Sequence, residues 1–235
     1  MPESTKKMNR RDFLKVAGLA VGATGLSCTG LGALATSTPE ITFLEKNSEG
    51  ANNMNKVLIA YASKAGSTGE VAGAIAEELS AKGMLADVLQ IKDVKDLGGY
   101  QAVVIGSAIR MGSWLSEATK FLETHKTSLS RIPTAFFTVC MTLHEETGEN
   151  RRKVEEFMQP VRAIHEPSSL GLFAGKMDYS KLSFLDRQII KIVKVPEGDF
   201  RNWTDIEAWT VGIAIELGAL QTPPVASITT KEGKQ

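Results

Sequence analysis

The clearest chemistry in this sequence lies in a short loop rich in hydroxyl groups, Ser63-Lys64-Ala65-Gly66-Ser67-Thr68. The loop follows an apolar run at 57–61 and precedes a pattern typical of a helix. The start of a helix offers unpaired N–H groups and the positive end of its dipole, and serine or threonine hydroxyls add donors without charge. Gly66 lets the backbone approach a ligand closely. These features predict a phosphate-binding loop, although the same turn can serve only as a helix cap.

Two familiar phosphate motifs are absent from this loop. It has no Gly-Lys-Ser or Gly-Lys-Thr ending, so it is not a nucleoside-triphosphate loop. It also lacks Gly-x-Gly-x-x-Gly, the fingerprint of dinucleotide binding. The expected ligand is therefore a single phosphate monoester.

The charge balance and the histidines exclude other classes of site. The 235 residues contain 27 lysines and arginines and 27 acidic residues. Because bulk nucleic-acid binding needs a basic surface, no nucleic-acid partner is expected. The three histidines, His125, His144 and His165, show no ligand spacing, so no metal site is expected.

From residue 56 onward, short apolar runs alternate with amphipathic stretches, which is typical of a parallel α/β sheet. Strands are expected at 57–60, 86–90, 102–106, 134–139 and 170–174, and helices at 68–82, 115–125, 151–164 and 205–220. A phosphate loop after the first strand favours a doubly wound sheet of five parallel strands in the order 2-1-3-4-5. Ligands of such sheets bind at the carboxyl ends of the strands, so the loops after Tyr61, Ile105 and Val139 are the candidates.

The second and third of these loops carry a family resemblance. The second reads Gly106-Ser107-Ala108-Ile109-Arg110-Met111-Gly112-Ser113-Trp114, and the third follows Thr138-Val139-Cys140. Together with the first loop, these runs resemble the flavodoxin-like family, and specifically its quinone-dependent protoporphyrinogen oxidase branch. The similarity covers roughly residues 56–220 and implies an α/β, flavodoxin-like fold.

The resemblance implies FMN as the cofactor. Its phosphate is expected at the first loop and its isoalloxazine ring between the second and third loops, where backbone donors and an apolar or aromatic wall are needed. No catalytic residue follows from the resemblance. The candidate cofactor-binding residues are Ser63, Lys64, Ala65, Gly66, Ser67, Thr68, Ser107, Ala108, Ile109, Arg110, Met111, Gly112, Trp114, Thr138, Val139 and Cys140.

Several of these residues allow two interpretations. Trp114 can form a wall for the ring or belong to the core, and Arg110 can offset flavin or phosphate charge or form a surface ion pair. Cys140 can touch the ring or be a buried small hydrophobe. The sequence also departs from the family twice, because Ala65 stands where a hydroxyl is common and Met111 where an aromatic is common.

The N-terminal segment Asn9-Arg10-Arg11-Asp12-Phe13-Leu14-Lys15 precedes an uncharged stretch with five glycines and resembles a twin-arginine export signal. We expect a signal at 1–35, a linker at 36–54, the flavodoxin-like domain at 55–221 and a disordered tail at 222–235. The protein would then lie in the periplasm or on the outer face of the cytoplasmic membrane. A transmembrane anchor, or lipid attachment at Cys28, is the alternative.

An insertion is expected within the domain at 176–203. Its apolar residues from 182 to 193 fall on one helical face and its cations on another, so 182–195 predicts an amphipathic helix. Such a helix can contact a membrane surface or pack on the domain with its cations in water.

Three functions remain open at this point. The first is an exported FMN-dependent oxidoreductase that passes electrons between a donor and a membrane quinone. The second is a protoporphyrinogen oxidase, although an export signal places it away from the site of haem synthesis. The third is a flavodoxin-type electron carrier; such carriers are usually strongly acidic for docking, whereas this chain is neutral, which counts against this function.

Overall fold

Five parallel strands form the centre of the computed structural model, which describes residues 44–47, 56–183, 187–188, 190, 192 and 195–219. Their order across the sheet is β2-β1-β3-β5-β6. The strands are β1 (Lys56–Ala62), β2 (Leu85–Gln90), β3 (Ala102–Arg110), β5 (Thr134–Cys140) and β6 (Ser169–Ala174). A short strand, β4 (Ser113–Trp114), pairs antiparallel with the end of β3. When the five long strands are numbered in chain order, without β4, their order across the sheet is 2-1-3-4-5. This confirms the expected arrangement.

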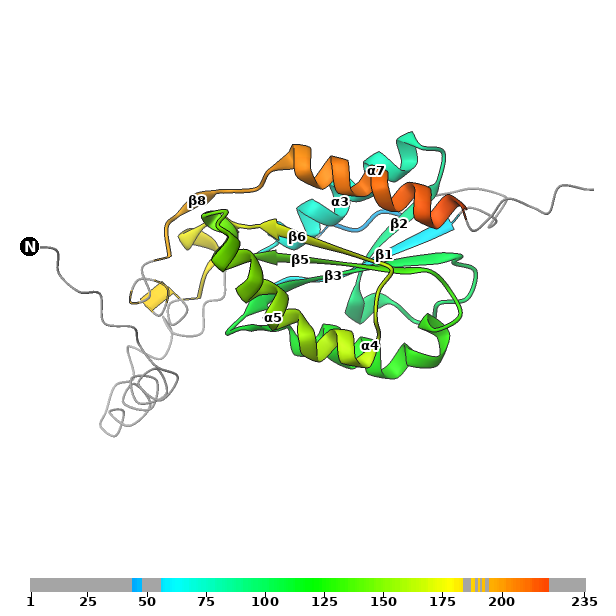
Figure 1. Cartoon of the computed structure of the whole chain (residues 1–235), viewed down its shortest axis with the longest axis horizontal. Coiled ribbons are helices and arrows are strands. Elements are labelled where there is room, and N and C mark those ends of the chain that lie inside the picture. The colour runs from blue at the N-terminus through cyan, green and yellow to red at the C-terminus, as the bar shows by residue number, and fades with distance from the viewer. Residues whose placement is uncertain are drawn as a thin grey trace, which may run out of the picture.

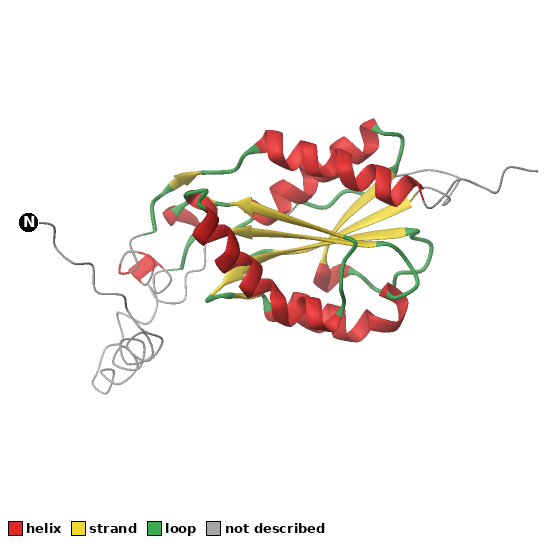
Figure 2. Ribbon diagram, viewed as in Figure 1, coloured by secondary structure: helices red, strands yellow, loops and turns green. Residues whose placement is uncertain are grey.

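Helices cover both faces of this sheet (Figures 1 and 2). On one face lie α3 (Ser67–Ala81) and α7 (Trp203–Ala219), and on the other lie α4 (Ser116–Leu129) and α5 (Gly148–Ile164). Their bounds differ by a few residues from those expected, because helix ends depend on capping as much as on apolar spacing. Short 3-10 turns follow two strands of the main sheet, η2 (Ile91–Asp93) after β2 and η3 (Met141–His144) after β5.

The continuous apolar runs of the strands follow from this two-sided covering. In β1, Val57, Ile59 and Tyr61 pack in the core beneath α3 and α7. The alternate residues Leu58 and Ala60 pack in the core against α4 and α5. Successive side chains of a strand point to opposite faces of the sheet. A strand that is buried on both faces therefore needs apolar residues at consecutive positions.

Gly106 in β3 is required by close packing with the neighbouring strand. A Cβ atom at this position would lie 1.9 Å from Cζ of Phe137, whose side chain is fully buried. Any side chain would displace the Phe137 ring from the core. The glycine is therefore explained by close packing between β3 and β5.

Part of the expected linker contacts the domain. Lys46 forms an isolated antiparallel bridge with Val88 of the edge strand β2, with N···O distances of 3.0 and 2.7 Å. The fully buried Tyr61 donates a hydrogen bond from its hydroxyl to the carbonyl of Leu44 over 2.7 Å. Burial, reinforced by Glu45, raises the pKa of Tyr61 to about 12. Residues 44–47 therefore extend the folded unit beyond the start expected at residue 55.

The insertion at 176–203 is closed at its base by a two-stranded ribbon. Its strands are β7 (Lys176–Met177) and β8 (Gly198–Asp199), and a 3-10 turn, η4 (Tyr179–Lys181), follows β7. The Tyr179 hydroxyl donates to the carbonyl of Val195 over 2.6 Å. Half of the residues of the helix expected at 182–195 lie outside the described residues, and the signal at 1–35 and the tail at 222–235 lie outside them entirely. Among the helices that the structure does describe, none is both long and apolar enough to cross a membrane.

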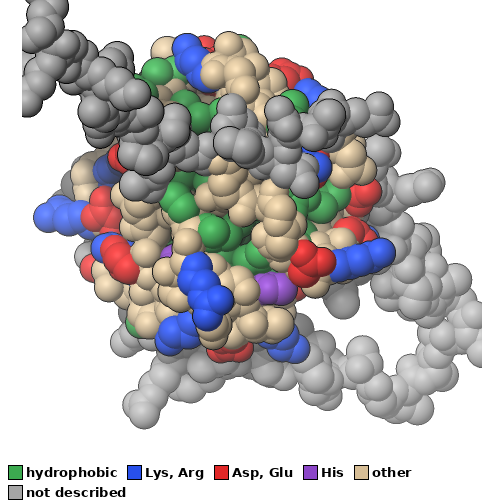
Figure 3. Space-filling view, turned by 90° about the vertical axis from the view of Figure 1, so that its right-hand side faces the viewer, with side chains coloured by type: hydrophobic (Ala, Val, Ile, Leu, Met, Phe, Trp, Pro, Cys, Tyr) green, Lys and Arg blue, Asp and Glu red, His purple; other side chains and the backbone are tan. Residues whose placement is uncertain are grey.

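The two ends of the sheet differ in character. The amino ends of the strands face the viewer in Figure 3, where apolar side chains lie among basic and acidic ones. At this end the buried carboxylate of Asp87 accepts a hydrogen bond from the Tyr100 hydroxyl over 2.7 Å and pairs with Lys56 over 2.8 Å. The carboxyl ends lie on the opposite side of the molecule, and the three candidate loops leave the sheet there.

Candidate functional site

The strand register brings the three candidate loops together at one edge of the sheet. Ala62 at the end of β1 pairs with Ser107 of β3, which in turn pairs with Thr138 of β5. Since these are neighbouring parallel strands, the chain segments that follow them lie side by side. The sequence-predicted residues from all three loops therefore belong to one region, at the carboxyl ends of the strands.

The first loop is held in a tight turn by its own groups. Gly66 adopts a left-handed conformation with φ of 90°, and its N–H donates to Oγ of Ser63 over 2.9 Å. The carbonyl of Gly66 accepts from the N–H groups of Gly69 and Glu70, which begins α3. The first N–H groups of α3 have no acceptor within the helix and point out of its end. The loop has the form of an anion cradle.

Thr68 provides an independent sign that this loop can bind a ligand. Its side chain is completely buried, and its Oγ1 has no hydrogen-bond partner among the residues that the structure describes. A buried hydroxyl without a partner costs about 1–3 kcal/mol, so native proteins rarely keep one without a reason. An acceptor oxygen bound at the start of α3 would remove this cost. A phosphate group supplies such oxygens.

Lys64 lies on the outside of the same loop. Its side chain is more than half exposed, and its Nζ lies 3.6 Å from Oε1 of Glu117 in the first turn of α4. An exposed ion pair of this kind contributes little stability. Ala65, where related loops offer a hydroxyl, adds no donor beyond its backbone, so the donors that this loop directs at a ligand are backbone N–H groups and hydroxyls.

The polar side chains at the base of the second and third loops bond to one another. Trp114 donates from Nε1 to Oγ1 of Thr138 over 3.2 Å, and Thr138 donates to the carbonyl of Ser107 over 3.1 Å. Oγ of Ser107 accepts from the N–H of Leu115 over 3.1 Å. Trp114 is only 4% exposed and packs on Phe136 with a centroid distance of 5.1 Å. The structure therefore places Trp114 in the core, as in the second of its two interpretations, and not as an open aromatic wall.

The tip of the second loop is a two-residue hairpin turn. Met111 and Gly112 join β3 to β4, with φ of 53° and 77°. Two successive left-handed residues are typical of a type I′ turn, which suits the twist of a hairpin. The side chain of Met111 is 78% exposed. Arg110 beside it is exposed, Ile109 and Ala108 are half-buried, and all of them lie at the carboxyl end of β3.

The third loop begins with a buried thiol. Cys140 is 4% exposed, and its Sγ accepts from the N–H of Thr142 over 3.4 Å. Burial raises the pKa of this thiol, which favours the uncharged form. Val139 before it is also buried and faces the opposite core. Cys140 is therefore confirmed as a buried small residue, although its backbone still borders the site.

Comparison with known proteins decides the family. A family model described as the flavodoxin domain matches residues 58–203. The chain belongs to the flavodoxin domain family. FMN is accordingly its cofactor, and the anion cradle and the unpartnered Thr68 hydroxyl are features that fit its phosphate.

Two curated relatives of this flavodoxin domain share a name. The protoporphyrinogen IX dehydrogenase [quinone] of Leishmania major is 30% identical over 196 residues, which cover 77% of this chain and 84% of that protein. The protein of the same name from Escherichia coli K12 is 28% identical over 148 residues, covering 61% of this chain and 81% of its own length. Among solved structures, a flavodoxin from the domain Archaea is 20% identical, with a TM-score of 0.42, and covers 69% of this chain and 98% of its own.

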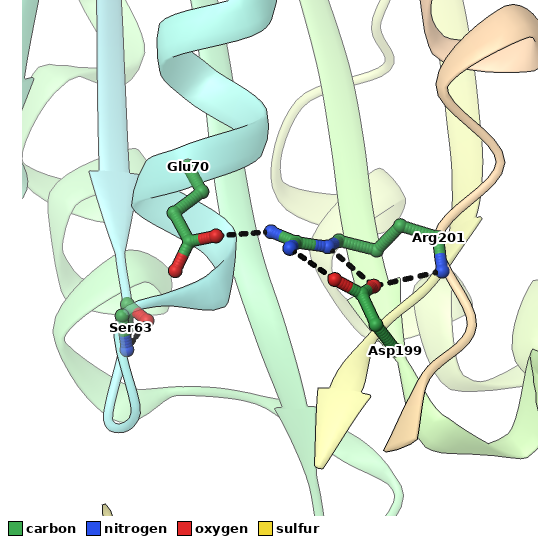
Figure 4. A network of polar contacts seen from close by, with 5 residues as sticks. Ser63, Glu70, Asp199 and Arg201 are labelled. Carbon is green, nitrogen blue, oxygen red and sulfur yellow. Dashed lines mark hydrogen bonds and ion pairs between the residues drawn. The ribbon is translucent and has the colours of Figure 1, made fainter. Parts of the chain in front are cut away.

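The flavodoxin domain also contains a polar network that sequence reasoning missed. Arg201, just after β8, donates from Nε to Oδ1 of Asp199 over 2.8 Å and from Nη2 to Oδ2 over 2.5 Å. Its Nη1 reaches Oε2 of Glu70, in the first turn of α3, over 2.6 Å (Figure 4). Glu70 and Arg201 are 131 residues apart, and no local pattern connects them. This network ties the end of the insertion to the helix that follows the phosphate loop.

A small cavity adjoins the third loop on the side of β6. It has a volume of about 220 Å³, and His144, Phe173, Phe200 and Asp205 are among the residues that line it. The volume lies below the range of about 300–1,000 Å³ that is usual for small-molecule pockets. Its lining also mixes Arg151 with acidic groups, so it does not indicate the charge of a ligand.

Proposed function

We propose that this chain is an FMN-dependent oxidoreductase that passes electrons from a donor to a membrane quinone. The observation that carries the proposal is the buried Thr68 hydroxyl, left without a partner at the start of α3. Family membership supports the cofactor, and the bracketed word "quinone" in the names of both curated relatives supports the acceptor.

The residues of the three loops have distinct roles in this proposal. The phosphate of FMN is held by the loop from Ser63 to Thr68, through backbone N–H groups, the Thr68 hydroxyl and the positive end of the α3 dipole. FMN supplies the redox chemistry, because its ring can take up one or two electrons. The backbone at residues 107–112 and 138–143 orients the ring, and the exposed side chain of Met111 shields it from water.

The buried polar network beneath these loops serves positioning. Trp114, Thr138 and Ser107 hold the second and third loops at a fixed separation through hydrogen bonds of 3.1–3.2 Å. A preorganised pair of loops loses little entropy on binding, which strengthens cofactor affinity. The neutral thiol of Cys140 takes part as an apolar group and carries no charge toward the ring.

A second candidate is a protoporphyrinogen dehydrogenase proper. The observation in its favour is that both curated relatives carry this name, one of them at 30% identity over 84% of its length. A third candidate, an electron carrier without a substrate of its own, agrees less well with the equal numbers of acidic and basic residues.

One set of assays separates these functions. The protein without residues 1–35 is expected to be yellow and to release one FMN per chain; a colourless protein that does not bind added FMN would exclude the proposal. Reduction of a soluble quinone is then measured with protoporphyrinogen IX and with general reductants, using flavin-stripped protein as the control. Fast porphyrin formation supports the second candidate, and electron exchange with a carrier protein alone supports the third.

The location of the protein is a separate part of the proposal. Arg10 and Arg11 support export by the twin-arginine route, and this route carries folded proteins, so FMN would be inserted before export. Replacing both arginines with lysine should keep the protein in the cytoplasmic fraction. Equal export of the two forms would contradict this route, and labelling with a fatty acid would show whether Cys28 carries a lipid.

A further inference from the structure

Arg201 is a buried arginine placed between two carboxylates and an aromatic ring. Its side chain is 4% exposed. The guanidinium makes a two-pronged contact with Asp199, and its carbon lies 4.4 Å from the centre of the Trp203 ring. The backbone N–H of Arg201 also donates to Asp199 over 3.2 Å. Asp199 and Trp203 together hold the guanidinium in one orientation, and its Nη1 points at Glu70.

Glu70 belongs to the phosphate-binding part of the structure. It lies in the first turn of α3, and its N–H donates over 3.1 Å to the carbonyl of Gly66, the residue that turns the loop. A carboxylate in this position is attracted by the same helix dipole that attracts a phosphate. In Figure 4 its carboxylate points toward Arg201. Arg201 therefore fixes the one acidic side chain in the first turn of α3.

The net charge of this network determines how strongly it repels an anion bound nearby. Glu70 and Asp199 contribute two negative charges and Arg201 one positive charge, which leaves a net charge of −1. Loss of the guanidinium would double that negative charge. A phosphate monoester carries about −1.5 to −2 at neutral pH, and charges within a Debye length of about 8–10 Å still interact at physiological salt. Riboflavin, which has no phosphate, would not experience the change.

We infer that Arg201 is a positioning residue for phosphate selectivity: by holding and neutralising Glu70, it lets the start of α3 prefer FMN over riboflavin. The inference rests on the proposed placement of the FMN phosphate at Ser63 to Thr68. It also gives the end of the insertion a role in cofactor binding, because Asp199 and Arg201 both belong to that segment.

The test compares the dissociation constants of FMN and riboflavin, measured with apoprotein by quenching of flavin fluorescence. Arg201→Met should weaken FMN binding about fivefold to tenfold and change riboflavin binding less than about twofold. The loss should shrink at high salt, because it is electrostatic. Adding Glu70→Gln to Arg201→Met should restore most of the preference for FMN.

One further variant keeps the inference testable if Arg201→Met does not fold. Glu70→Gln makes the network less negative and leaves the contacts of Arg201 with Asp199 and Trp203 in place, so it should raise the ratio of FMN to riboflavin affinity. Arg162→Met is the matched control, because it removes a guanidinium from an exposed ion pair with Glu166 at the far end of α5. That variant should leave the ratio unchanged.

The outcomes distinguish this inference from the proposal beneath it. If the wild-type protein binds FMN and riboflavin equally, the placement of the phosphate is wrong. If the wild type prefers FMN but Arg201→Met weakens both ligands equally, without dependence on salt, Arg201 has a merely structural role and the inference is overturned. A ratio that falls in Glu70→Gln would overturn it as well.

Discussion

The indole nitrogen of Trp114 and the hydroxyl of Thr138 form a hydrogen bond of 3.2 Å that joins the two loops expected to hold the flavin ring. The two residues come from different strands, β4 and β5. Both are buried, so the bond is shielded from water. The same contact explains why Trp114 faces the core and why the hairpin carrying it keeps a fixed position beside β5.

Replacing Trp114 with Phe should destabilise the apoprotein and weaken FMN binding together. The variant loses a buried hydrogen bond and leaves a cavity beside Phe136, at a cost of about 1–3 kcal/mol. Urea unfolding followed by circular dichroism measures the stability, and flavin fluorescence measures the affinity. Trp209→Phe is the matched control, because its indole bonds to Ser169 over 3.1 Å at a position away from the loops. An equal loss of FMN affinity in both variants would contradict the role of Trp114.

Thr68→Val should separate stability from binding. The substitution removes a buried hydroxyl that has no partner among the described residues, so the apoprotein should keep its stability or gain about 1 kcal/mol. Affinity for FMN should fall by about tenfold, since a hydrogen bond to the phosphate is lost, while affinity for riboflavin stays the same.

Thr210→Val is the matched control for this experiment. The Thr210 hydroxyl is equally buried but donates to the carbonyl of Ile206 over 2.7 Å within α7. This variant should lose its hydrogen bond without any change in FMN affinity. A stable Thr68→Val variant with wild-type affinity would remove that hydroxyl from the phosphate site.

Met111→Gly should stabilise the apoprotein by about 1 kcal/mol, because φ of 53° is strained for methionine and free for glycine. The side chain is mostly exposed, so little packing is lost. If Met111 covers the flavin, the variant should nevertheless bind FMN more weakly. Thermal unfolding and flavin titration are the measurements.

Two companion substitutions separate the turn from the side chain. Met111→Ala removes the side chain but keeps the strain, so it should lose affinity without gaining stability. Gly112→Ala should lose about 1–2 kcal/mol, because its φ is 77° and a Cβ would lie 3.1 Å from Cε1 of Phe157. A Met111→Gly variant less stable than Met111→Ala would show that the turn differs in solution.

Tyr61→Phe should alter the alkaline stability of the protein. Burial raises the pKa of Tyr61 to about 12, above the usual value of 10.0, so the folded state keeps a proton that the unfolded chain loses between these values. The stability contribution is complete below pH 10 and is lost as the pH rises toward 12. At neutral pH the variant should be less stable by about 1 kcal/mol, because the bond to Leu44 is missing.

The difference in unfolding free energy between the wild type and Tyr61→Phe should therefore shrink as the pH is raised from 9 toward 12. Guanidinium unfolding at a series of pH values measures it. Parallel profiles of the two proteins across this range would show that the Tyr61 hydroxyl is not buried as described.

The sheet and its helices could be predicted because burial of the strands on two faces produces short apolar runs that are visible in the sequence. The strands at 57–60 and 102–106 have no polar side chain, and the strand at 134–139 has only two, Thr134 and Thr138; both cores of the structure use these strands. The hairpin at Met111 and Gly112 was harder to foresee, since methionine rarely adopts a left-handed conformation. The export signal at 1–35 and the membrane contact at 182–195 remain predictions.

Contacts between distant segments produce no such local pattern in the sequence. Glu70 and Arg201 are 131 residues apart, and each alone looks like an ordinary surface charge. Leu44 lies in a stretch that reads as a linker, yet its carbonyl accepts a bond from the buried Tyr61. These pairings depend on the placement of whole elements, which residue types and spacing do not encode locally.

The sequence by itself determined the order of strands and helices, the place of the three loops and the family they belong to. Only the tertiary structure decided which hydroxyls remain for a ligand. Ser107 and Thr138 are occupied in holding the loops, whereas Thr68 has no partner among the described residues. The physical reason is that a buried polar group takes its partners from neighbouring strands, and these are brought beside it only when the sheet forms.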